Sequence, residues 1–422
     1  MRLNIMKKKI VLIIFIIGII KVEAQTSAFK SIDELINRGR YNKALISLKN
    51  MPETFLSNRK IASIYEVIDN VKLAIMYYEK ALIIKDDYTT RVKLGKLYKK
   101  TKYFPKAITV FKDIVNKDPD NLLISYQLGK LYLLIKKPKK AITIFKKLIE
   151  RDSANANYYY YKGLAYKLLK KRNLKINSFL EAYKKDKAHI KAIEFLAHSY
   201  TALRYRDSAK IFIDKGLEIN PSHIKLNKLK INSLYRRKKY AEAIQILKKI
   251  DTLKRNELYT QNMLGRSFYN LKKYQKAEEY FTKAKQIDHL DYRIYGYLGD
   301  VSFDQKKYKE ASLRYMYATF IGKELRDVEY YKLARTYEEL NNPKLAIKAY
   351  GNALKENYRN YKALYQLATV SESYYKNKKI AYKHYKGYMN RFEMKDSVLS
   401  DHVKRRLIEI KKFYFKKGEV LD

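Results

Sequence analysis

The chain contains no cysteine among its 422 residues. Disulfide bonds are therefore excluded, as is membrane attachment through a lipid-modified cysteine, so the fold must rely on packing alone. Proline and glycine are also scarce, with 6 and 13 residues. No stretch rich in these residues reads as a linker, so we expect one continuous domain and not the several that the length alone would suggest.

Residue patterns that carry chemistry are missing as well. The 6 histidines are scattered singly along the chain, whereas a metal site needs convergent ligands. The sequence has no glycine-rich phosphate loop and no nucleophile elbow. Paired carboxylates such as Asp86-Asp87 and Glu338-Glu339 fall at the ends of helical stretches or on polar faces. We therefore predict a protein that is not an enzyme and binds no cofactor and no metal.

A long apolar run occurs only near the start of the chain. Arg2 and Lys7–Lys9 precede an unbroken apolar run of 11 residues, 10–20, and small or branched residues lead up to Ala24. This pattern predicts a secretory signal peptide over residues 1–24, with cleavage after Ala24. The run is too short for the roughly 20 residues of a membrane-spanning helix. We expect export to the periplasm or cell surface of a Gram-negative-type bacterium, with no transmembrane segment in the mature chain.

What the sequence does have is a period of about 34 residues, which is typical of a solenoid. A small residue recurs, an alanine follows twelve residues later, and an aromatic or branched residue comes four after that. The small residues are Ala62, Gly95, Gly129, Gly163, Ala197, Gly265, Gly299, Ala334 and Ala368. Each period holds two apolar-periodic stretches around a short polar turn, which predicts a helical hairpin. We interpret the small residues as packing positions where the paired helices approach closely.

These marks resemble the tetratricopeptide repeat family. The clearest unit is 258–291, with Leu264-Gly265, Phe268, Tyr274, Ala277, Phe281 and Ala284. The resemblance implies an all-α fold, an α-solenoid in which about ten to eleven hairpins form a right-handed superhelix over residues 25–390. The repeats would start near residues 25, 55, 88, 122, 156, 190, 224, 258, 292, 327 and 361.

Three repeats depart from the pattern. Lys175 replaces the alanine of the second helix, so we expect its hairpin to pack more loosely or to be distorted. Ile231 stands where glycine or alanine is expected, which could shift the helix by one residue. Ala381 comes one place late and implies a single-residue insertion.

The last segment, 391–422, is predicted to be an amphipathic capping helix and tail. Its apolar residues have helical spacing, with basic residues between them; they are Leu399, Val403, Leu407, Ile410 and Tyr414. The alternative is a helix that binds a membrane surface or a partner.

In the tetratricopeptide family, the exposed side of the first helices lines a concave groove that binds peptides. The resemblance places a set of aromatic, basic and amide residues there: Tyr126, Tyr160, Lys130, Lys228, Asn232, Tyr259, Asn262, Arg266, Tyr269, Arg293, Tyr331, Arg335 and Tyr365, with Lys99 and Lys167 among further basic positions. Tyrosine and arginine dominate binding hot spots. Such a groove suits an extended peptide with acidic groups or a terminal carboxylate.

Some members of the family hold a peptide's terminal carboxylate with a five-residue clamp of Lys, Asn, Asn, Lys and Arg. Here Lys228 and Asn232 match the first two positions and Arg293 takes the fourth. Asn262 lies one place early for the third, and Tyr297 stands where the fifth should be arginine. The clamp is therefore matched only in part.

The formal net charge is +48, of which residues 1–24 supply +4. The excess of lysine could be compositional, or it could be an electrostatic footprint for an acidic partner. We predict an exported scaffold or adaptor of the bacterial envelope that binds an acidic protein or peptide in its groove. The alternative is an envelope protein that binds a polyanion, such as an acidic glycan or lipopolysaccharide, through its basic surface. Export argues against nucleic acid as a partner.

Overall fold

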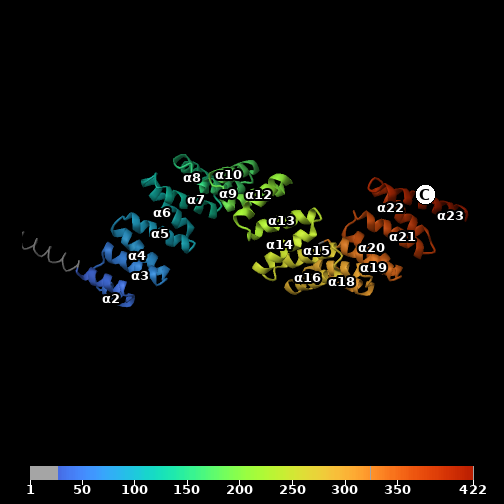
Figure 1. Ribbon diagram of the computed structural model, residues 1–422, viewed down its shortest axis with the longest axis horizontal. Coiled ribbons are helices and arrows are strands. Elements are labelled where there is room, and N and C mark those ends of the chain that lie inside the picture. The colour runs from blue at the N-terminus through green and yellow to red at the C-terminus, as the bar shows by residue number, and fades with distance from the viewer. Residues whose placement is uncertain (1–26, 324, 422) are drawn as a thin grey trace, which may run out of the picture. The chain divides into compact units, whose positions relative to one another are not determined.

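The computed structural model describes residues 27–323 and 325–421, and within these the secondary structure is helical, without strands. Consecutive helices pack as antiparallel hairpins (Figure 1). The predicted all-α solenoid of helical hairpins is confirmed. The signal peptide predicted over 1–24 lies outside the described residues. No helix in the described ranges is long and apolar enough to cross a membrane.

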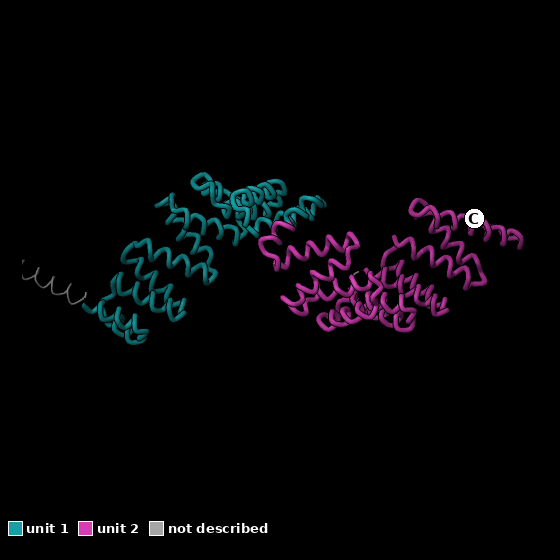
Figure 2. Tube along the Cα trace, viewed as in Figure 1, with its two compact units in different colours: residues 1–212 teal, residues 213–422 magenta. Residues whose placement is uncertain are grey.

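The chain divides into two compact units, with the boundary between Phe212 and Ile213 (Figure 2). Unit 1 contains a helix over 27–37 followed by α2 (Tyr41–Lys49), α3 (Phe55–Val67), α4 (Val71–Ile84), α5 (Tyr88–Lys100), α6 (Phe104–Lys117), α7 (Leu122–Leu134), α8 (Pro138–Arg151), α9 (Ala156–Leu168), α10 (Arg172–Lys185) and α11 (Ile190–Ala202). The boundary falls inside α12 (Arg206–Ile219), so no linker separates the units, in keeping with the scarcity of proline and glycine.

Unit 2 contains the remaining helices. They are α13 (Ile224–Arg236), α14 (Tyr240–Leu253), α15 (Leu258–Asn270), α16 (Tyr274–Ile287), α17 (Tyr292–Asp304), α18 (Tyr308–Ile321), α19 (Asp327–Glu339), α20 (Pro343–Glu356), α21 (Tyr361–Tyr374), α22 (Lys379–Phe392) and α23 (Ser397–Phe415). In both units the core runs along the stack and is formed where each hairpin meets the next.

In most hairpins the small residue of the first helix packs against the large residue sixteen positions later in the second helix. A Cβ atom on Gly95 would lie 2.4 Å from the ring of Phe111, and one on Gly265 would lie 2.6 Å from Phe281. These rings are almost completely buried. The glycines are therefore needed for close approach of the two helices, which confirms the packing interpretation.

The same pairing explains why Ile231 causes no shift in register. Helix α13 has 13 residues, like the first helices of the neighbouring hairpins, and Ile231 is fully buried. Its partner sixteen positions later is Leu247, where most other hairpins carry an aromatic ring and one carries Ile213. A larger residue on one helix is thus matched by a smaller one on the other, and the expected one-residue shift is wrong.

The expected loosening around Lys175 is not found either. Helix α10 keeps the usual 14 residues, and Phe179 remains fully buried against Gly163. Lys175 is only half-buried, and burial lowers the pKa of its ammonium group. Because a lysine can place its stem in the interface and its charge near water, the hairpin accommodates the substitution.

The insertion before Ala381 is accommodated at the turn of the last hairpin. Helix α21 has 14 residues, one more than the other first helices of unit 2. In the other hairpins a residue with positive φ closes this turn, for example Lys306 at 61° and Asn341 at 54°. No such residue occurs between α21 and α22.

The C-terminal helix α23 packs against α22 of the last hairpin. Val403, Ile410 and Tyr414 are buried on its inner face. Arg406 pairs with Glu372 of α21, and the hydroxyl of Tyr365 lies 3.2 Å from Nδ1 of His402. Helix α23 therefore covers side chains of the first helix of the last hairpin, including one that was assigned to the groove.

Candidate functional site

In unit 1, neighbouring hairpins are joined by stacked aromatic rings on the side of the first helices. The ring of Tyr161 in α9 stacks on Phe145 of the preceding hairpin, with centroids 5.7 Å apart and planes 15° apart. Phe195 in α11 stacks on Phe179 in the same way, at 4.8 Å and 15°. Tyr161 and Phe195 each occupy the sixth position of their first helix. A surface residue of one hairpin thus covers the buried ring of the hairpin before it.

Lysines from the preceding first helix lie over these stacks. The Nζ of Lys130 is 5.3 Å from the ring centroid of Tyr161, and that of Lys167 is 4.7 Å from Phe195. An ammonium group over an aromatic face is stabilised by the ring's quadrupole, by about 0.5–1 kcal/mol at exposed sites. The contact positions both lysines on the first-helix side of unit 1.

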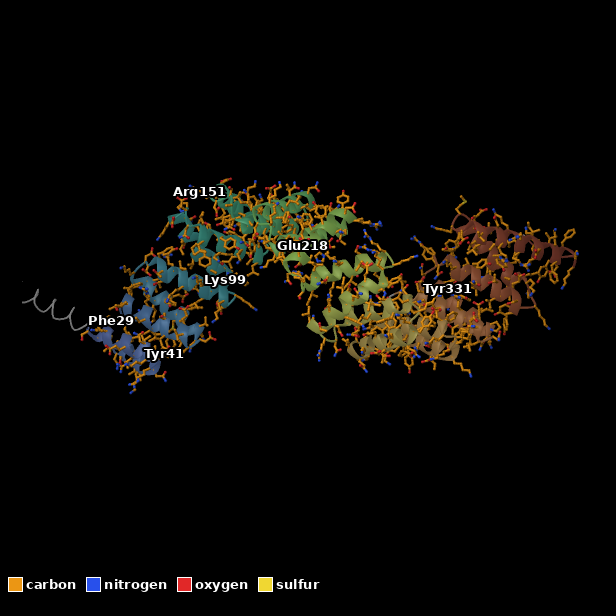
Figure 3. The ribbon with its side chains drawn as sticks, in the orientation of Figure 1. Phe29, Tyr41, Lys99, Arg151, Glu218 and Tyr331 are labelled. Carbon is orange, nitrogen blue, oxygen red and sulfur yellow. The ribbon has the colours of Figure 1, made fainter. Side chains whose placement is uncertain are left out.

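An open cavity of about 420 Å³ lies among α5, α7 and α9. Its lining residues are Lys99, Lys130, Leu131, Leu133, Leu134, Tyr161, Leu164, Lys167 and Leu168. We call it the lysine pocket; Figure 3 labels Lys99 on α5. Five leucines and a tyrosine ring give it an apolar lining, and three ammonium groups supply its charge.

The charge of the lysine pocket is not neutralised within the described chain. No carboxylate of residues 27–323 or 325–421 lies within ion-pair distance of Lys99, Lys130 or Lys167. Lys99 donates a hydrogen bond to the amide oxygen of Gln127 at 2.9 Å. Burial and the charge of Lys130 lower the pKa of Lys99. Bringing an anion to this pocket would relieve that repulsion.

The corresponding side of unit 2 is organised differently, because its polar groups pair with one another. Lys228 forms an ion pair with Glu257 at 2.7 Å, and the hydroxyl of Tyr259 donates to Oδ1 of Asn232 at 2.9 Å. Burial raises the pKa of Tyr259 to about 12. The hydroxyl of Tyr269 donates to Asp304 at 2.7 Å.

The partial carboxylate clamp is likewise engaged within the chain. Lys228 is paired with Glu257, and Asn232 accepts from Tyr259. Arg293 is turned to Asp291, the N-cap residue of its own helix, with Nε 2.9 Å from the carboxylate. Oδ1 of Asn262 is buried without a hydrogen-bond partner among the described residues. A peptide carboxylate would have to displace existing carboxylate partners to use Lys228 or Arg293.

Several aromatic residues that the sequence assigns to the groove are packing residues. Tyr160 is 7% exposed and contacts Phe179 and His189, at centroid distances of 5.7 and 5.1 Å. Burial raises its pKa to about 12. Tyr126 packs on Tyr158 and Tyr161, at 5.7 and 5.4 Å. These rings stabilise the contact between hairpins and offer little surface to a partner.

Three other groove assignments lie towards the end of unit 2. Tyr331 packs on Tyr350 at 5.6 Å, and Tyr365 is covered by α23. Arg335 is exposed, with its guanidinium 5.2 Å from the ring of Phe303. Arg266 lies between two rings, 4.7 Å from Tyr235 and 5.5 Å from Tyr297. Of the four basic groove assignments in unit 2, only Arg266 and Arg335 have no carboxylate of the described residues in ion-pair distance.

Sequence reasoning missed Tyr161 and the leucines of the lysine pocket. The signal was available in the period, since Tyr161, Phe195 and Tyr297 all occupy the sixth position of their first helices. The groove prediction named the neighbouring residue, Tyr160, instead. The geometry brings Lys130 together with Lys99 and Lys167, whereas Lys228 and Arg293 serve other contacts. In the described chain, no group of three or more His, Asp or Glu side chains is placed to hold a metal.

Two sequence-family models, both described as tetratricopeptide repeat, match the chain. One covers residues 331–372, and the other covers residues 124–155, 190–223 and 258–288. With the repeated hairpins above, these matches show that the chain belongs to the tetratricopeptide repeat proteins. Such repeats form protein-interaction scaffolds, and this is the general class of the chain. Among curated proteins, none matches it.

Solved structures with similar folds include three repeat proteins. MamA from Desulfovibrio magneticus RS-1 is 22% identical over 41% of this chain and 98% of its own, with a TM-score of 0.37. The Cut9–Hcn1 hetero-tetramer of the APC/C is 15% identical over 90% and 83%, with a TM-score of 0.44. Pseudomonas aeruginosa pilF is 19% identical over 52% and 99%, with a TM-score of 0.43. At these values, no function carries over to this chain.

Proposed function

We propose that this protein is an exported, non-catalytic scaffold that binds an acidic protein partner in the lysine pocket of unit 1. The observation that carries the proposal is the combination of three lysines without carboxylate partners and an apolar lining. An anionic segment that also carries apolar side chains would satisfy both features, because it neutralises the lysines while covering leucine surface.

The binding site proposed here differs from the full groove expected from the sequence. In unit 2 Lys228, Tyr259 and Tyr269 already have partners within the fold, so a ligand gains little by replacing them. Arg266 and Arg335 of this unit have no carboxylate partner among the described residues and lie over aromatic rings. In unit 1, by contrast, the ligand would supply interactions that the chain lacks. We therefore assign the affinity for the partner to α5, α7 and α9.

The experiment is a calorimetric titration of the full chain with a twelve-residue peptide that alternates leucine with aspartate and glutamate. The test variant carries Lys99→Gln, Lys130→Gln and Lys167→Gln. Its matched control carries Lys139→Gln, Lys146→Gln and Lys171→Gln, three exposed lysines of the same unit outside the pocket. Both variants lose three positive charges, so a difference between them reports position and not net charge.

We expect the pocket variant to bind about tenfold or more weakly, which corresponds to at least about 1.4 kcal/mol. The control should bind within about twofold of the natural chain, because distant exposed charges are screened by salt. Equal weakening of both variants would show that the basic surface as a whole is the binding element.

The alternative function, binding of an anionic envelope polymer, rests on the net charge of +48. A polyanion contacts many lysines at once and releases counterions, so its affinity falls steeply with salt. Titration with purified lipopolysaccharide at about 50 and about 200 mM salt separates the two functions. The polymer function predicts a loss of several orders of magnitude and equal affinity of the two triple variants.

Export is the second part of the proposal and rests on the pattern of residues 1–24. The mature protein purified from its native cells should begin at Gln25, as read by mass spectrometry of its N-terminal peptide. Mature protein that retains peptides containing Lys7 through Ile20 would contradict the proposal.

A further inference from the structure

A second cavity of unit 1 lies among α6, α7 and α8, on another face of α7 from the lysine pocket. Its volume is about 610 Å³. Leu128 and Leu148, both almost fully buried, form part of its floor, and Ser125 of α7 faces it. Arg151 at the end of α8, labelled in Figure 3, lies at its edge. We call it the Ser125 cavity.

The cavity is lined by Ser125, the smallest residue at its position in the first helices. This residue is the fourth of its first helix, and the fourth residues of the other first helices from α3 to α21 are all larger. They are Asn58, Arg91, Tyr159, Ile193, Asn227, Gln261, Tyr295, Tyr330 and Leu364. In α7 alone among these helices, a hydroxymethyl group occupies the place of a longer side chain.

The next hairpin shows what fills the equivalent space. Tyr159, 34 residues after Ser125, is 8% exposed, and its hydroxyl donates to the carbonyl of Ser153 at 3.3 Å. The Nζ of Lys185 lies 6.0 Å from its ring centroid. The residues that precede Ser153 and Lys185 by 34 positions are Pro119 and Arg151, and both line the Ser125 cavity. The residues around the cavity therefore correspond to those around the buried Tyr159, but Ser125 supplies no ring to occupy the space.

The basic residues around the cavity favour a ligand whose aromatic residue has acidic neighbours. The cavity's charged lining consists of Lys112, Lys147 and Arg151 with one carboxylate, that of Glu150. Lys112 and Lys147 are exposed, without a carboxylate of the described residues in ion-pair distance. Arg151 forms an exposed ion pair with Asp120 at 3.2 Å. An incoming segment with carboxylates beside its aromatic residue would meet complementary charge here.

We propose that the Ser125 cavity is a docking site for a tyrosine side chain of a partner protein, flanked by acidic residues. The phenol ring enters over Leu128 and Leu148 and takes the place that Tyr159 takes in the next hairpin. Its hydroxyl donates to the carbonyl of Pro119, and the guanidinium of Arg151 lies over its face. A buried aromatic ring of this kind anchors many protein interfaces.

The test uses the full chain and three capped pentapeptides, in which tyrosine, leucine or alanine is flanked on both sides by aspartate and glutamate. Affinities are measured by NMR titration of each peptide. The tyrosine peptide should bind at least fivefold more tightly than the alanine peptide, with leucine between them. Equal affinity of the three peptides would overturn the proposal.

The key variant is Ser125→Tyr, which fills the cavity from within as Tyr159 does. It should raise the melting temperature and weaken binding of the tyrosine peptide at least tenfold. The Ser125→Ala protein should bind this peptide with an affinity within twofold of that of the natural chain. A Ser125→Tyr protein that melts higher and still binds the peptide would contradict the proposal.

Two further variants keep the test decisive if Ser125→Tyr does not fold. Arg151→Gln changes an exposed side chain and should weaken binding of the tyrosine peptide at least threefold. Tyr159→Ser opens an equivalent cavity and should raise the stoichiometry from one peptide to two. Unchanged affinity in the first and unchanged stoichiometry in the second would overturn the assignment. The triple variant of the lysine pocket should bind the tyrosine peptide normally, which keeps this site separate from the proposed function.

Discussion

At the scale of single residues, the fold is held by pairs of small and large side chains sixteen positions apart. Glycine faces phenylalanine at Gly265 and Phe281, and isoleucine faces leucine at Ile231 and Leu247. The sum of the two volumes matters more than the identity of either residue, as in other close-packed cores. A glycine in such a pair is therefore different from a glycine in an open helix position.

Substitution by alanine should separate these two kinds of glycine. Gly265→Ala places a methyl group 2.6 Å from Phe281 and should destabilise the protein by about 1–3 kcal/mol through overpacking. Gly351→Ala, in α20 with no atom within 4 Å of the new Cβ, should stabilise by about 0.5–1 kcal/mol. Urea denaturation measures both. Changes of the same sign in the two variants would contradict the packing account.

Buried tyrosines make stability depend on alkaline pH. Where tyrosine replaces phenylalanine in the packed pair, its hydroxyl donates to a nearby carboxylate: Tyr78 to Glu66 at 2.8 Å and Tyr315 to Asp300 at 2.7 Å. Burial raises the pKa of each phenol, and the carboxylate adds to the effect. Because the folded pKa is the higher one, this stability is complete below the unfolded pKa of about 10 and declines above it.

We therefore expect tyrosine absorbance at 295 nm to report two classes of the 42 tyrosines during an alkaline titration. Phenols in water ionise near pH 10, whereas buried ones such as Tyr78 and Tyr315 should ionise only together with loss of helical circular dichroism. Ionisation of all tyrosines near pH 10 with the helix signal intact would be inconsistent with these contacts.

At the scale of elements, the hairpin turns use a left-handed residue that is usually not glycine. Lysine occupies this place in several turns, for example Lys136 with φ of 55° and Lys272 with φ of 56°. Lysine has no conformational advantage there over glycine or asparagine. Its presence at these positions supports a general compositional excess of lysine, so the net charge alone is weak evidence for a polyanion partner.

Lys136→Gly should therefore stabilise the protein by up to about 1 kcal/mol, because relief of left-handed strain outweighs the entropy cost of glycine. Lys137→Gly, at the neighbouring position with φ of −105°, is the control and should not stabilise. Thermal unfolding of the two variants measures the difference, and equal effects would count against the turn geometry.

The capping helix α23 is held in part by Arg406. Glu372, whose side chain is 13% exposed, receives Arg406 and the hydroxyl of Tyr385. Although burial opposes it, the pairing keeps the pKa of Glu372 below its usual value, so this stability is present above about pH 4.5 and is lost as pH falls. Arg406→Met should cost about 1–3 kcal/mol at pH 7. The cost should shrink at pH 4, and a constant cost would argue against the ion pair.

At the scale of the whole molecule, the period of the sequence determines the fold more fully than it determines the site. A recurring small residue and its partner sixteen positions later are local features, and they place each hairpin without knowledge of its neighbours. Whether a charged side chain is paired, by contrast, depends on residues of other hairpins. Lys228 is neutralised by Glu257 and Tyr269 is bonded to Asp304, each in the neighbouring hairpin. Periodicity indicates which side a residue lies on, but not whether another repeat has already paired it.

We propose that a few positioned lysines, and not the overall charge, receive the partner. Lysine reactivity tests it most directly: the full chain is reductively methylated with and without the alternating acidic and leucine peptide, and each lysine is quantified by mass spectrometry. We expect Lys99, Lys130 and Lys167 to be protected at least threefold and Lys139, Lys146 and Lys171 to be unchanged. Uniform protection across all six lysines, or protection of the second set alone, would contradict it.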